Sequence, residues 1–368
     1  MKKKYFIRSN KRREKMKIAI GLSGGVDSAV AALLLKRAGY DVIGTTMKIW
    51  DGKRAAQVKG NSCYGPGEHE DIEIASKICS LLAIPYHVID CAQPYNEIVL
   101  RYFDDEYREG RTPNPCVACN EKIKFGILPL LLEKSGITFD RFATGHYART
   151  DFDRIGARYL LKKGKDAKKD QSYFLYRLSQ TQLAKVMFPL GDYSKDRVRA
   201  IAREAGLPVH DKQESQDFYG GDYAELLSAK SGPGDILDDS GAVIGRHAGI
   251  ENFTIGQRKG LGVAGGTPLY VVAINADRNE VVLGRRELLL ARGLRARDLN
   301  IIAGEMPRRA YVKTRSTAEA AACIIGFDGT ELEIMFDERQ SAIAPGQSAV
   351  VYNDDIVVGG GIIAQAIP

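Results

Sequence analysis

Residues 17–28 read KIAIGLSGGVDS in one-letter code, a short apolar run that ends in a turn rich in glycine and serine. Residues 29–38 continue as an apolar helical pattern, which Gly39 closes. A strand, a glycine turn and a helix N-terminus together offer backbone amides that phosphate oxygens can approach closely. The turn has neither the Gly-Lys-Ser/Thr ending of a Walker loop nor the spacing of a dinucleotide fingerprint. It predicts a phosphate site of another class, with Ser23 and Ser28 as hydroxyl donors and Asp27 as a candidate Mg²⁺ ligand.

Strand-like and helical segments alternate through the N-terminal half of the chain. We expect further strands at residues 41–50, 86–89 and 142–147, and helices at 70–82, 96–107 and 121–134, the last interrupted at Pro129. Residues 111–115 read as a proline-punctuated loop. Alternation of this kind predicts an α/β fold, in which helices cover both faces of a parallel sheet. Ligands of such sheets gather beyond the carboxyl ends of the strands, so the glycine turn and the cysteines after residue 115 are expected to meet there.

The residue pattern changes near residue 209, and from there glycine-rich stretches separate short runs of β-branched residues. We expect a small mixed domain over residues 209–279 and an all-β domain, a small barrel, over residues 280–368. The phosphate-binding catalytic domain would then span residues 16–208. Residues 1–15 are predicted to be a basic, disordered extension.

The net charge of +7 does not by itself indicate a polyanionic partner, because it resides in the first fifteen residues. These hold eight lysines and arginines against one glutamate, 8 − 1 = +7, so the remaining residues are formally neutral. Six cysteines in 368 residues are too few for a disulfide scaffold and indicate a reducing compartment. No apolar run reaches the roughly 20 residues of a membrane span, and no secretory leader is visible. A cytoplasmic protein without a membrane partner is therefore expected.

The hexapeptide Ser23-Gly24-Gly25-Val26-Asp27-Ser28 closely resembles the signature of the PP-loop ATP pyrophosphatases. This resemblance implies that a substrate oxygen attacks the α-phosphate of ATP and that pyrophosphate leaves. An adenylated oxygen departs readily as AMP, whereas a carbonyl oxygen is a poor leaving group. The signature implies ATP and Mg²⁺ as cofactors but does not identify the substrate.

Further motifs, in family order, resemble those of the tRNA-specific 2-thiouridylases (the MnmA family). They are RTPNP (111–115), CN (119–120), IKF (123–125), ATGHY (143–147), KDQSY (169–173), FTIGQRKG (253–260) and PGQSAV (345–350). The resemblance implies that sulfur replaces the 2-oxygen of the wobble uridine on tRNAs for Lys, Glu and Gln. It also implies a sulfur donor, which is a cysteine desulfurase, a relay protein or sulfide.

The same resemblance implies roles for individual residues of this chain. ATP would contact Gly21, Leu22, Ser23, Gly24, Gly25, Val26, Asp27, Ser28, Met47 and Gly145. The tRNA would contact Asn114, Pro115, Cys116, His146, Lys169, Asp170, Gln171, Arg315, Ser316 and Gln347. Among these, residues 114–116 would face the target base, and Cys119 matches the cysteine usually named as the nucleophile.

The sequence departs from the family pattern at two places. The family places its second catalytic cysteine in a segment that corresponds to residues 214–219, where this chain has no cysteine and Tyr219 occupies about the expected position. A phenol cannot carry persulfide sulfur. The position three residues before Cys119 is commonly aspartate in the family and is Cys116 here. The usual scheme of two distant cysteines therefore cannot be transferred unchanged.

Two arrangements of the cysteines would restore the chemistry. In one, Cys116 and Cys119 form a local C-x-x-C redox pair that can close a disulfide. In the other, Cys63, Cys116 and Cys119 hold a 4Fe-4S cluster whose fourth iron carries sulfide, with Cys91 as an alternative third ligand. Bystander cysteines and a zinc site are further alternatives, although zinc lacks a second pair of ligands at suitable spacing.

Two other function classes remain open from the sequence. A PP-loop enzyme that amidates a small molecule needs an ammonia supply, and no glutaminase segment is evident. A protein that binds RNA or ATP without catalysis would explain the missing second cysteine. The intact phosphate turn and the added Cys116 favour altered chemistry over lost chemistry.

Overall fold

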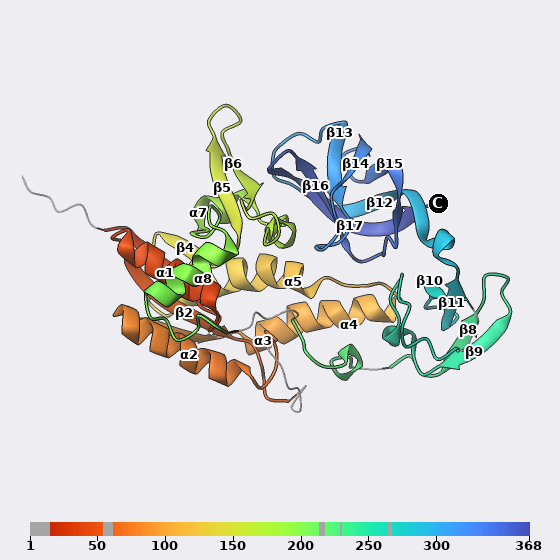
Figure 1. The fold of residues 1–368 in the computed structure, drawn as a ribbon, viewed down its shortest axis with the longest axis horizontal. Coiled ribbons are helices and arrows are strands. Elements are labelled where there is room, and N and C mark those ends of the chain that lie inside the picture. The colour runs from red at the N-terminus through yellow and green to blue at the C-terminus, as the bar shows by residue number, and fades with distance from the viewer. Residues whose placement is uncertain (1–14, 54–61, 213–217, 229, 264–266) are drawn as a thin grey trace, which may run out of the picture.

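The computed structural model describes residues 15–53, 62–212, 218–228, 230–263 and 267–368 (Figure 1). The extension predicted at residues 1–15 lies outside these residues except for Lys15, and so does most of the segment 214–219. Across the described ranges, no helix combines the length and apolar character needed to cross a membrane.

A five-stranded parallel sheet forms the centre of the N-terminal part, in the order β3-β2-β1-β4-β7. Its strands are β1 (Lys17–Gly21), β2 (Asp41–Lys48), β3 (Tyr86–Asp90), β4 (Arg141–Thr144) and β7 (Val186–Met187). Ile18 and Ile20 pack into one apolar cluster and Ala19 into another, because successive side chains of a strand point to opposite faces. Both faces are buried, as in parallel sheets generally. The predicted α/β class is confirmed.

Helices cover the two faces of this sheet. The cluster with Ile18 and Ile20 includes residues of α1 (Val26–Arg37), α2 (Glu68–Leu82) and α8 (Lys195–Glu204). The cluster with Ala19 includes residues of two longer helical segments. The first comprises α3 (Ala92–Tyr95), η1 (Asn96–Leu100) and α4 (Arg101–Arg108). The second comprises α5 (Pro115–Ala118), η2 (Cys119–Ile127) and α6 (Leu128–Lys134).

The second helical segment differs from the prediction at its start and at Pro129, and it ends at Lys134 as predicted. It begins at Pro115, inside the predicted proline loop, because proline suits the first position of a helix and Asn114 caps it. It also continues past Pro129 without the predicted interruption. The wide π-helical turns of η2 directly precede Pro129 and change the hydrogen-bond register, so the missing N–H of proline does not end the helix. The wide turns begin at Cys119.

A smaller antiparallel and parallel sheet follows in the middle of the chain, in the order β10-β11-β8-β9. Its strands are β8 (Gly234–Leu237), β9 (Val243–His247), β10 (Tyr270–Asn275) and β11 (Glu280–Gly284). It has an apolar cluster of its own, centred on Ile236, Val271 and Val281, each fully buried. This part matches the small mixed domain that the sequence predicts.

The C-terminal strands close into a six-stranded barrel. They are β12 (Leu290–Ile301), β13 (Arg309–Lys313), β14 (Ala321–Phe327), β15 (Leu332–Ser341), β16 (Ser348–Asn353) and β17 (Ile356–Ile367). Pairing of β12 with β17 closes the ring, which removes exposed strand edges. The predicted barrel is confirmed.

A hairpin from the N-terminal part extends the barrel sheet. It consists of β5 (Ala148–Asp153) and β6 (Arg158–Lys163), and β6 pairs with β17. Short helical segments complete the chain: α7 (Gln180–Lys185), η3 (Ser172–Leu175), η4 (Tyr223–Glu225), η5 (Ile250–Asn252) and η6 (Arg286–Leu289). The hairpin therefore connects the N-terminal part of the chain to the barrel through strand pairing.

Candidate active site

The glycine turn lies between β1 and α1, as predicted. Gly24 has a φ of +68°, and a Cβ added to it would lie 2.7 Å from the backbone oxygen of Asp71. Only glycine meets both conditions without strain. The hydroxyl of Ser28 accepts from the amide of Ser23 at 3.2 Å and donates to the carbonyl of Gly25 at 3.2 Å. The turn is thus closed by its own side chains, with a helix N-terminus behind it.

Other residues expected to contact ATP lie at the same edge of the sheet. Gly21 of β1 pairs with Thr45 of β2 and with Thr144 of β4, so the ends of these three strands are neighbours. Met47 is half-buried near the end of β2. Gly145 follows β4, and a Cβ on it would lie 2.7 Å from the amide nitrogen of Ser28. The absence of a side chain at residue 145 therefore allows β4 to approach the phosphate turn.

Asp27 has partners that the sequence did not predict. The ammonium of Lys195 lies 2.7 and 2.8 Å from its two carboxylate oxygens, and the hydroxyl of Tyr147 donates to Oδ1 at 2.8 Å. Both oxygens of the candidate Mg²⁺ ligand are therefore engaged in this structure. Lys195 lies 168 positions from Asp27 in the sequence, so no local motif connects the two residues.

The cysteine pair lies at the start of the second helical segment. The side chain of Asn114 accepts from the amide of Val117 at 3.3 Å and caps the helix. Cys116 and Cys119 are three residues apart on this helix, a spacing that places both thiols on one face. Both side chains are half-buried, and neither forms a disulfide.

A third thiol from a distant loop lies near this pair. Cys63 is exposed, and its charge contributes to raising the pKa of Cys119 to about 11, an effect due first to burial and opposed by the Lys124 ammonium. Burial and the neighbouring thiols of Cys119, Cys116 and Cys63 also raise the pKa of the Tyr95 phenol. The charges of all three predicted sulfur residues therefore act on one tyrosine.

The predicted metal arrangement is not assembled in the described part of the chain. Within these residues no group of three His, Cys, Asp or Glu side chains is placed to share a metal ion. Cys91, the alternative third ligand, is fully buried at the end of β3, and burial raises the pKa of its thiol to about 12. The three convergent thiols would have to move closer together to bind a cluster.

His146, expected to contact tRNA, follows β4 and is half-buried. Its ring packs on Phe125 and Phe188, at centroid distances of 5.8 and 6.2 Å, and its Nδ1 lies 2.7 Å from the Thr144 hydroxyl. Burial, with a smaller effect of Lys124, holds the pKa of His146 well below its ordinary value. The ring is therefore a neutral hydrogen-bonding group and not a cation for phosphate.

The segment 169–171 is fixed by its own polar side chains. Asp170 accepts from the amides of Gly164 and Ser172, at 3.0 and 3.1 Å. Gln171 exchanges two hydrogen bonds with Tyr147, each 2.9 Å long, one through its side chain and one through its backbone. Lys169 is half-buried beside them. The segment is thereby joined to the residue that also holds Asp27.

The barrel residues expected at the tRNA have protein partners. The side-chain amide of Gln347 donates to the backbone carbonyls of Thr112 and Pro113, at 3.1 and 3.0 Å. Both carbonyls lie in the loop before the helix that carries the cysteines. The guanidinium of Arg315 donates to the carbonyls of Ile255 and Ala342, both at 2.9 Å, and Ser316 is half-buried next to it. These contacts fix the loop, the middle sheet and the barrel relative to one another.

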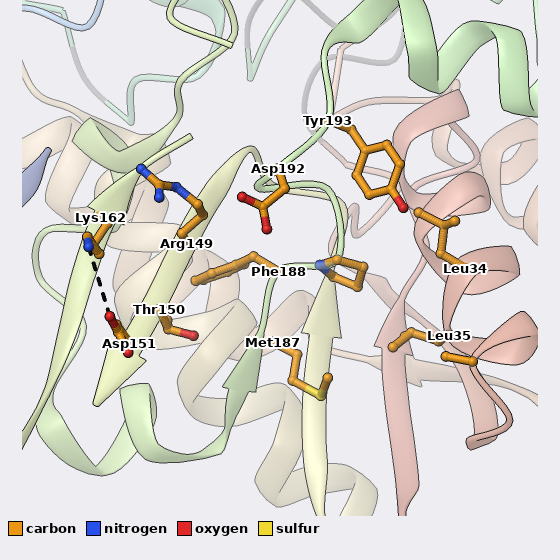
Figure 2. Close-up of a pocket in the computed structure, with 12 residues that line it drawn as sticks. Leu34, Leu35, Arg149, Thr150, Asp151, Lys162, Met187, Phe188, Asp192 and Tyr193 are labelled. Carbon is orange, nitrogen blue, oxygen red and sulfur yellow. Dashed lines mark ion pairs between the residues drawn. The ribbon is translucent and has the colours of Figure 1, made fainter. Parts of the chain in front are cut away.

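A hollow of about 550 Å³ lies between the end of α1 and the β5–β6 hairpin (Figure 2). Leu34 and Leu35 line one side, and Phe188 and the Lys162–Asp151 ion pair, 3.9 Å long, line another. None of the residues predicted to bind ATP, sulfur or tRNA lines it. The candidate active site is therefore defined by its side-chain chemistry and not by this cavity.

Comparison with known proteins places these observations in a family. Three family models match in succession: the tRNA methyl transferase HUP domain at residues 16–219, the tRNA methyl transferase PRC-barrel domain at 224–285, and the aminomethyltransferase beta-barrel domain at 291–363. The tRNA-specific 2-thiouridylase MnmA of Endomicrobium trichonymphae is 50% identical over 95% of this chain and 99% of its own length. This chain belongs to the MnmA family.

Other members are similar over their full length. The relatives from Clostridioides difficile and Moorella thermoacetica, also named tRNA-specific 2-thiouridylase MnmA, are 44% and 46% identical. They cover 95% and 94% of this chain, and it covers 99% and 98% of them. The resemblance inferred from the sequence is confirmed.

Within this family frame, Tyr219 has a structural role. Its hydroxyl donates to Glu225, and it belongs to the aromatic cluster of Phe218 and Tyr223. The carbonyl of Phe218 accepts from the amide of Tyr64 at 2.9 Å, so the loop that carries Cys63 is attached next to Tyr219, the position at which the sequence resemblance implies a second cysteine. Only the pairing of these two segments reveals this proximity.

Sequence reasoning missed two buried charged residues near the site. Lys195 is one, because a lone lysine at a helix start gives no motif. Glu68 is the other: its carboxylate accepts from the amides of Ile49 and Trp50, at 2.6 and 3.2 Å, and burial raises its pKa. It holds the end of β2 against the start of α2. An acidic residue in the first turn of a predicted helix is common and gave no signal.

Proposed function

We propose that this chain is an ATP-dependent tRNA-uridine 2-sulfurtransferase, which replaces the 2-oxygen of the wobble uridine by sulfur and releases AMP and pyrophosphate. The observation that carries the proposal is that a phosphate-binding turn and a thiol-bearing helix both pack on β4. Gly145, after this strand, contacts the amide of Ser28. Phe125, on the helix that carries Cys119, packs on Phe142 of the strand at 6.0 Å between ring centroids.

The reaction divides into two steps. The turn at residues 21–28, with Met47 and Gly145, binds ATP, and the uridine 2-oxygen attacks its α-phosphate while pyrophosphate leaves. Mg²⁺ accompanies the triphosphate and offsets its charge. Sulfur held at Cys119 then attacks carbon 2, and the original oxygen leaves with AMP. The backbone amides of the turn are preorganised for the developing phosphate charge.

The transferable sulfur enters as a persulfide on Cys119. A donor protein's persulfide passes its outer sulfur to the Cys119 thiolate and leaves as a thiol, or sulfide attacks the Cys119 sulfur of a Cys116–Cys119 disulfide and releases the Cys116 thiolate. Cys116 is the local partner: its thiolate attacks the Cys119 sulfur, the bond to the transferred sulfur breaks, and that bond's electrons remain on the thiolated base. A Cys116–Cys119 disulfide results, and an external thiol reduces it. The three-residue spacing on one helix face supports this arrangement.

A 4Fe-4S cluster on Cys63, Cys116 and Cys119 is the alternative form of sulfur carriage. The effect of all three thiols on the pKa of Tyr95 favours it, but no described group of three is placed to share a metal, so no step is derived through it. Iron and sulfide analysis of anaerobically purified protein separates the two. Iron-free protein that thiolates tRNA at full rate would exclude the cluster.

The tRNA is proposed to lie across Asn114, Pro115 and Cys116, with contacts to His146, the 169–171 segment and the barrel at Arg315, Ser316 and Gln347. ATP and tRNA are both cytoplasmic molecules, and we propose that location for the enzyme. Domains are proposed at residues 16–208, 209–279 and 280–368, the last contacting tRNA.

Nucleoside mass spectrometry on tRNA treated with the purified enzyme tests the function. The Cys119→Ser variant should still release pyrophosphate when tRNA is added but should form no 2-thiouridine. Cys323→Ser is the matched control, because Cys323 is buried in the barrel and its thiol already donates to the Ala310 carbonyl. Full 2-thiouridine formation by Cys119→Ser would overturn the proposal, and so would pyrophosphate release driven by small carboxylates and not by tRNA.

A further inference from the structure

Lys195 is the first residue of α8, and its side chain is only 8% exposed. Its position is fixed from two sides. The Lys195 amide donates to Asp166 at 2.9 Å, and Ser194 caps the helix by accepting from the amide of Arg197 at 3.3 Å. The start of α8 therefore positions the buried ammonium next to Asp27.

The ion pair between Lys195 and Asp27 engages both carboxylate oxygens. The ammonium contacts both carboxylate oxygens, at 2.7 and 2.8 Å, and also lies 5.9 Å from the centre of the Tyr147 ring. The hydroxyl of Tyr147 supplies a further hydrogen bond to Asp27. A buried ion pair tolerates desolvation only when its members are matched and hydrogen-bonded in this way, and removal of one leaves an uncompensated charge.

Asp27 lies in the first turn of α1, two residues after Gly25 of the proposed phosphate-binding turn. A carboxylate is favourable at a helix N-terminus, but it repels the phosphates that this N-terminus is expected to bind. A cation that accompanies the carboxylate removes the repulsion. Lys195 is in contact with both oxygens and so meets this requirement.

We propose that Lys195 is a positioning residue that acts as the internal counter-ion of the phosphate-binding turn, neutralising Asp27 so that the turn accepts the triphosphate of ATP. The inference rests on the proposed ATP binding at residues 21–28. It assigns Asp27 to the ion pair and not to Mg²⁺. Lys195 thus acts on ATP through Asp27, without touching the phosphates.

A double-mutant cycle tests this assignment by direct measurement of Mg-ATP binding, for example by calorimetry, without tRNA. Lys195→Met should weaken ATP binding at least about tenfold, because the Asp27 charge is left unbalanced at the phosphate site. Asp27→Asn combined with Lys195→Met removes both charges and should restore the affinity to within about threefold of the unmodified chain. Lys195→Arg, which keeps the charge, should also retain binding.

The controls address folding and surface charge. Lys185→Met removes an exposed lysine from the last turn of α7 and should leave ATP binding unchanged. Thermal unfolding of each variant shows whether the loss of the buried pair also unfolds the domain; the double variant, which has no unpaired charge, keeps the test decisive in that case.

Two outcomes would overturn the counter-ion role. If the double variant binds ATP no better than Lys195→Met, then either Lys195 contacts the phosphates itself or Asp27 holds the metal. If Lys195→Met binds as tightly as the unmodified chain, no counter-ion is needed. Failure of the proposed function has another signature: the unmodified chain binds ATP but forms no 2-thiouridine on tRNA.

Discussion

At the scale of single residues, the surroundings of His146 keep its ring neutral. Its ring is packed between Phe125 and Phe188, and its Nδ1 lies against the Thr144 hydroxyl, so burial lowers its pKa. In the unfolded chain the ring regains its ordinary pKa near 6.5. The unfolded state therefore binds a proton that the folded state does not, and the stability from His146 is complete above about pH 6.5 and declines as the pH falls.

The pH dependence of unfolding tests this assignment. The unmodified chain should lose at most about 1.4 kcal/mol per pH unit more than His146→Gln as the pH falls from 6.5 to 5, because glutamine does not titrate. Unfolding temperatures of both proteins, measured by calorimetry over pH 5 to 7.5, give the comparison. Parallel curves across this range would show that His146 is not buried as a neutral ring.

Gly145 is a second residue at which atomic contacts decide the outcome. Gly145→Ala would place a methyl group 2.7 Å from the Ser28 amide and 2.8 Å from the backbone carbon of Asp27, and backbone cannot move aside as a flexible side chain can. ATP binding should weaken at least about tenfold through displacement of the turn. Gly326→Ala on β14 is the control, because its methyl group would lie at an ordinary contact distance, 3.7 Å, from its nearest neighbour. Equal ATP affinity in both variants would contradict the proposed contact.

At the element scale, the turn before α1 is connected to the 169–171 segment through the residue after His146. Tyr147 donates its hydroxyl to Asp27 and shares two hydrogen bonds with Gln171. If tRNA contacts this segment, ATP and tRNA binding should influence each other, because linkage between two sites is reciprocal.

Tyr147→Phe breaks this connection at one atom and leaves the Lys195–Asp27 pair in place. The stimulation of pyrophosphate release by tRNA should fall about fivefold or more, a coupling of about 1 kcal/mol. Tyr311→Phe, at an exposed position of β13, should not change it. The measurement is the rate of pyrophosphate release with and without tRNA. If the ratio of these two rates is the same in Tyr147→Phe as in the unmodified chain, the coupling is contradicted.

At the scale of the whole molecule, the barrel holds the loop that leads to the cysteine helix. Gln347 donates to two carbonyls of this loop, and the Thr112 amide donates to the Pro345 carbonyl at 2.8 Å. A Cβ on Gly346 would lie 2.8 Å from the Thr112 oxygen, so the two parts are in close backbone contact. The barrel therefore supports the thiols in addition to any contact with tRNA.

Gln347→Glu separates these two roles, because glutamate keeps the shape but loses the donor and repels the carbonyls. Single-turnover thiolation should slow about tenfold, since a small displacement of the reacting sulfur is costly. The tRNA affinity, measured by filter binding, should change less than about threefold. The exposed Gln365→Glu on β17 is the control. Lost tRNA affinity with an unchanged rate would instead indicate a direct contact with RNA.

Much of the architecture was accessible from sequence because its signals are local. The strand, glycine turn and helix at residues 17–37 are specified by neighbouring residues, and the apolar core of β1 follows from its uninterrupted hydrophobic run. The limit of local reasoning is seen at Pro129, where a proline in a helical pattern suggested a break. The π-helical turns that begin at Cys119 allow the helix to continue through Pro129. This continuation is visible only in the hydrogen-bond register of the whole segment.

By itself, the sequence determined the phosphate turn, the α/β class and the spacing of Cys116 and Cys119, since each depends on residues a few positions apart. The tertiary structure alone decided which distant groups meet. It placed Lys195 on Asp27, Cys63 near Cys119, and Gln347 on the loop at Thr112. Such contacts arise from packing of elements far apart in the chain, and no local pattern encodes the partner of a buried charge or thiol.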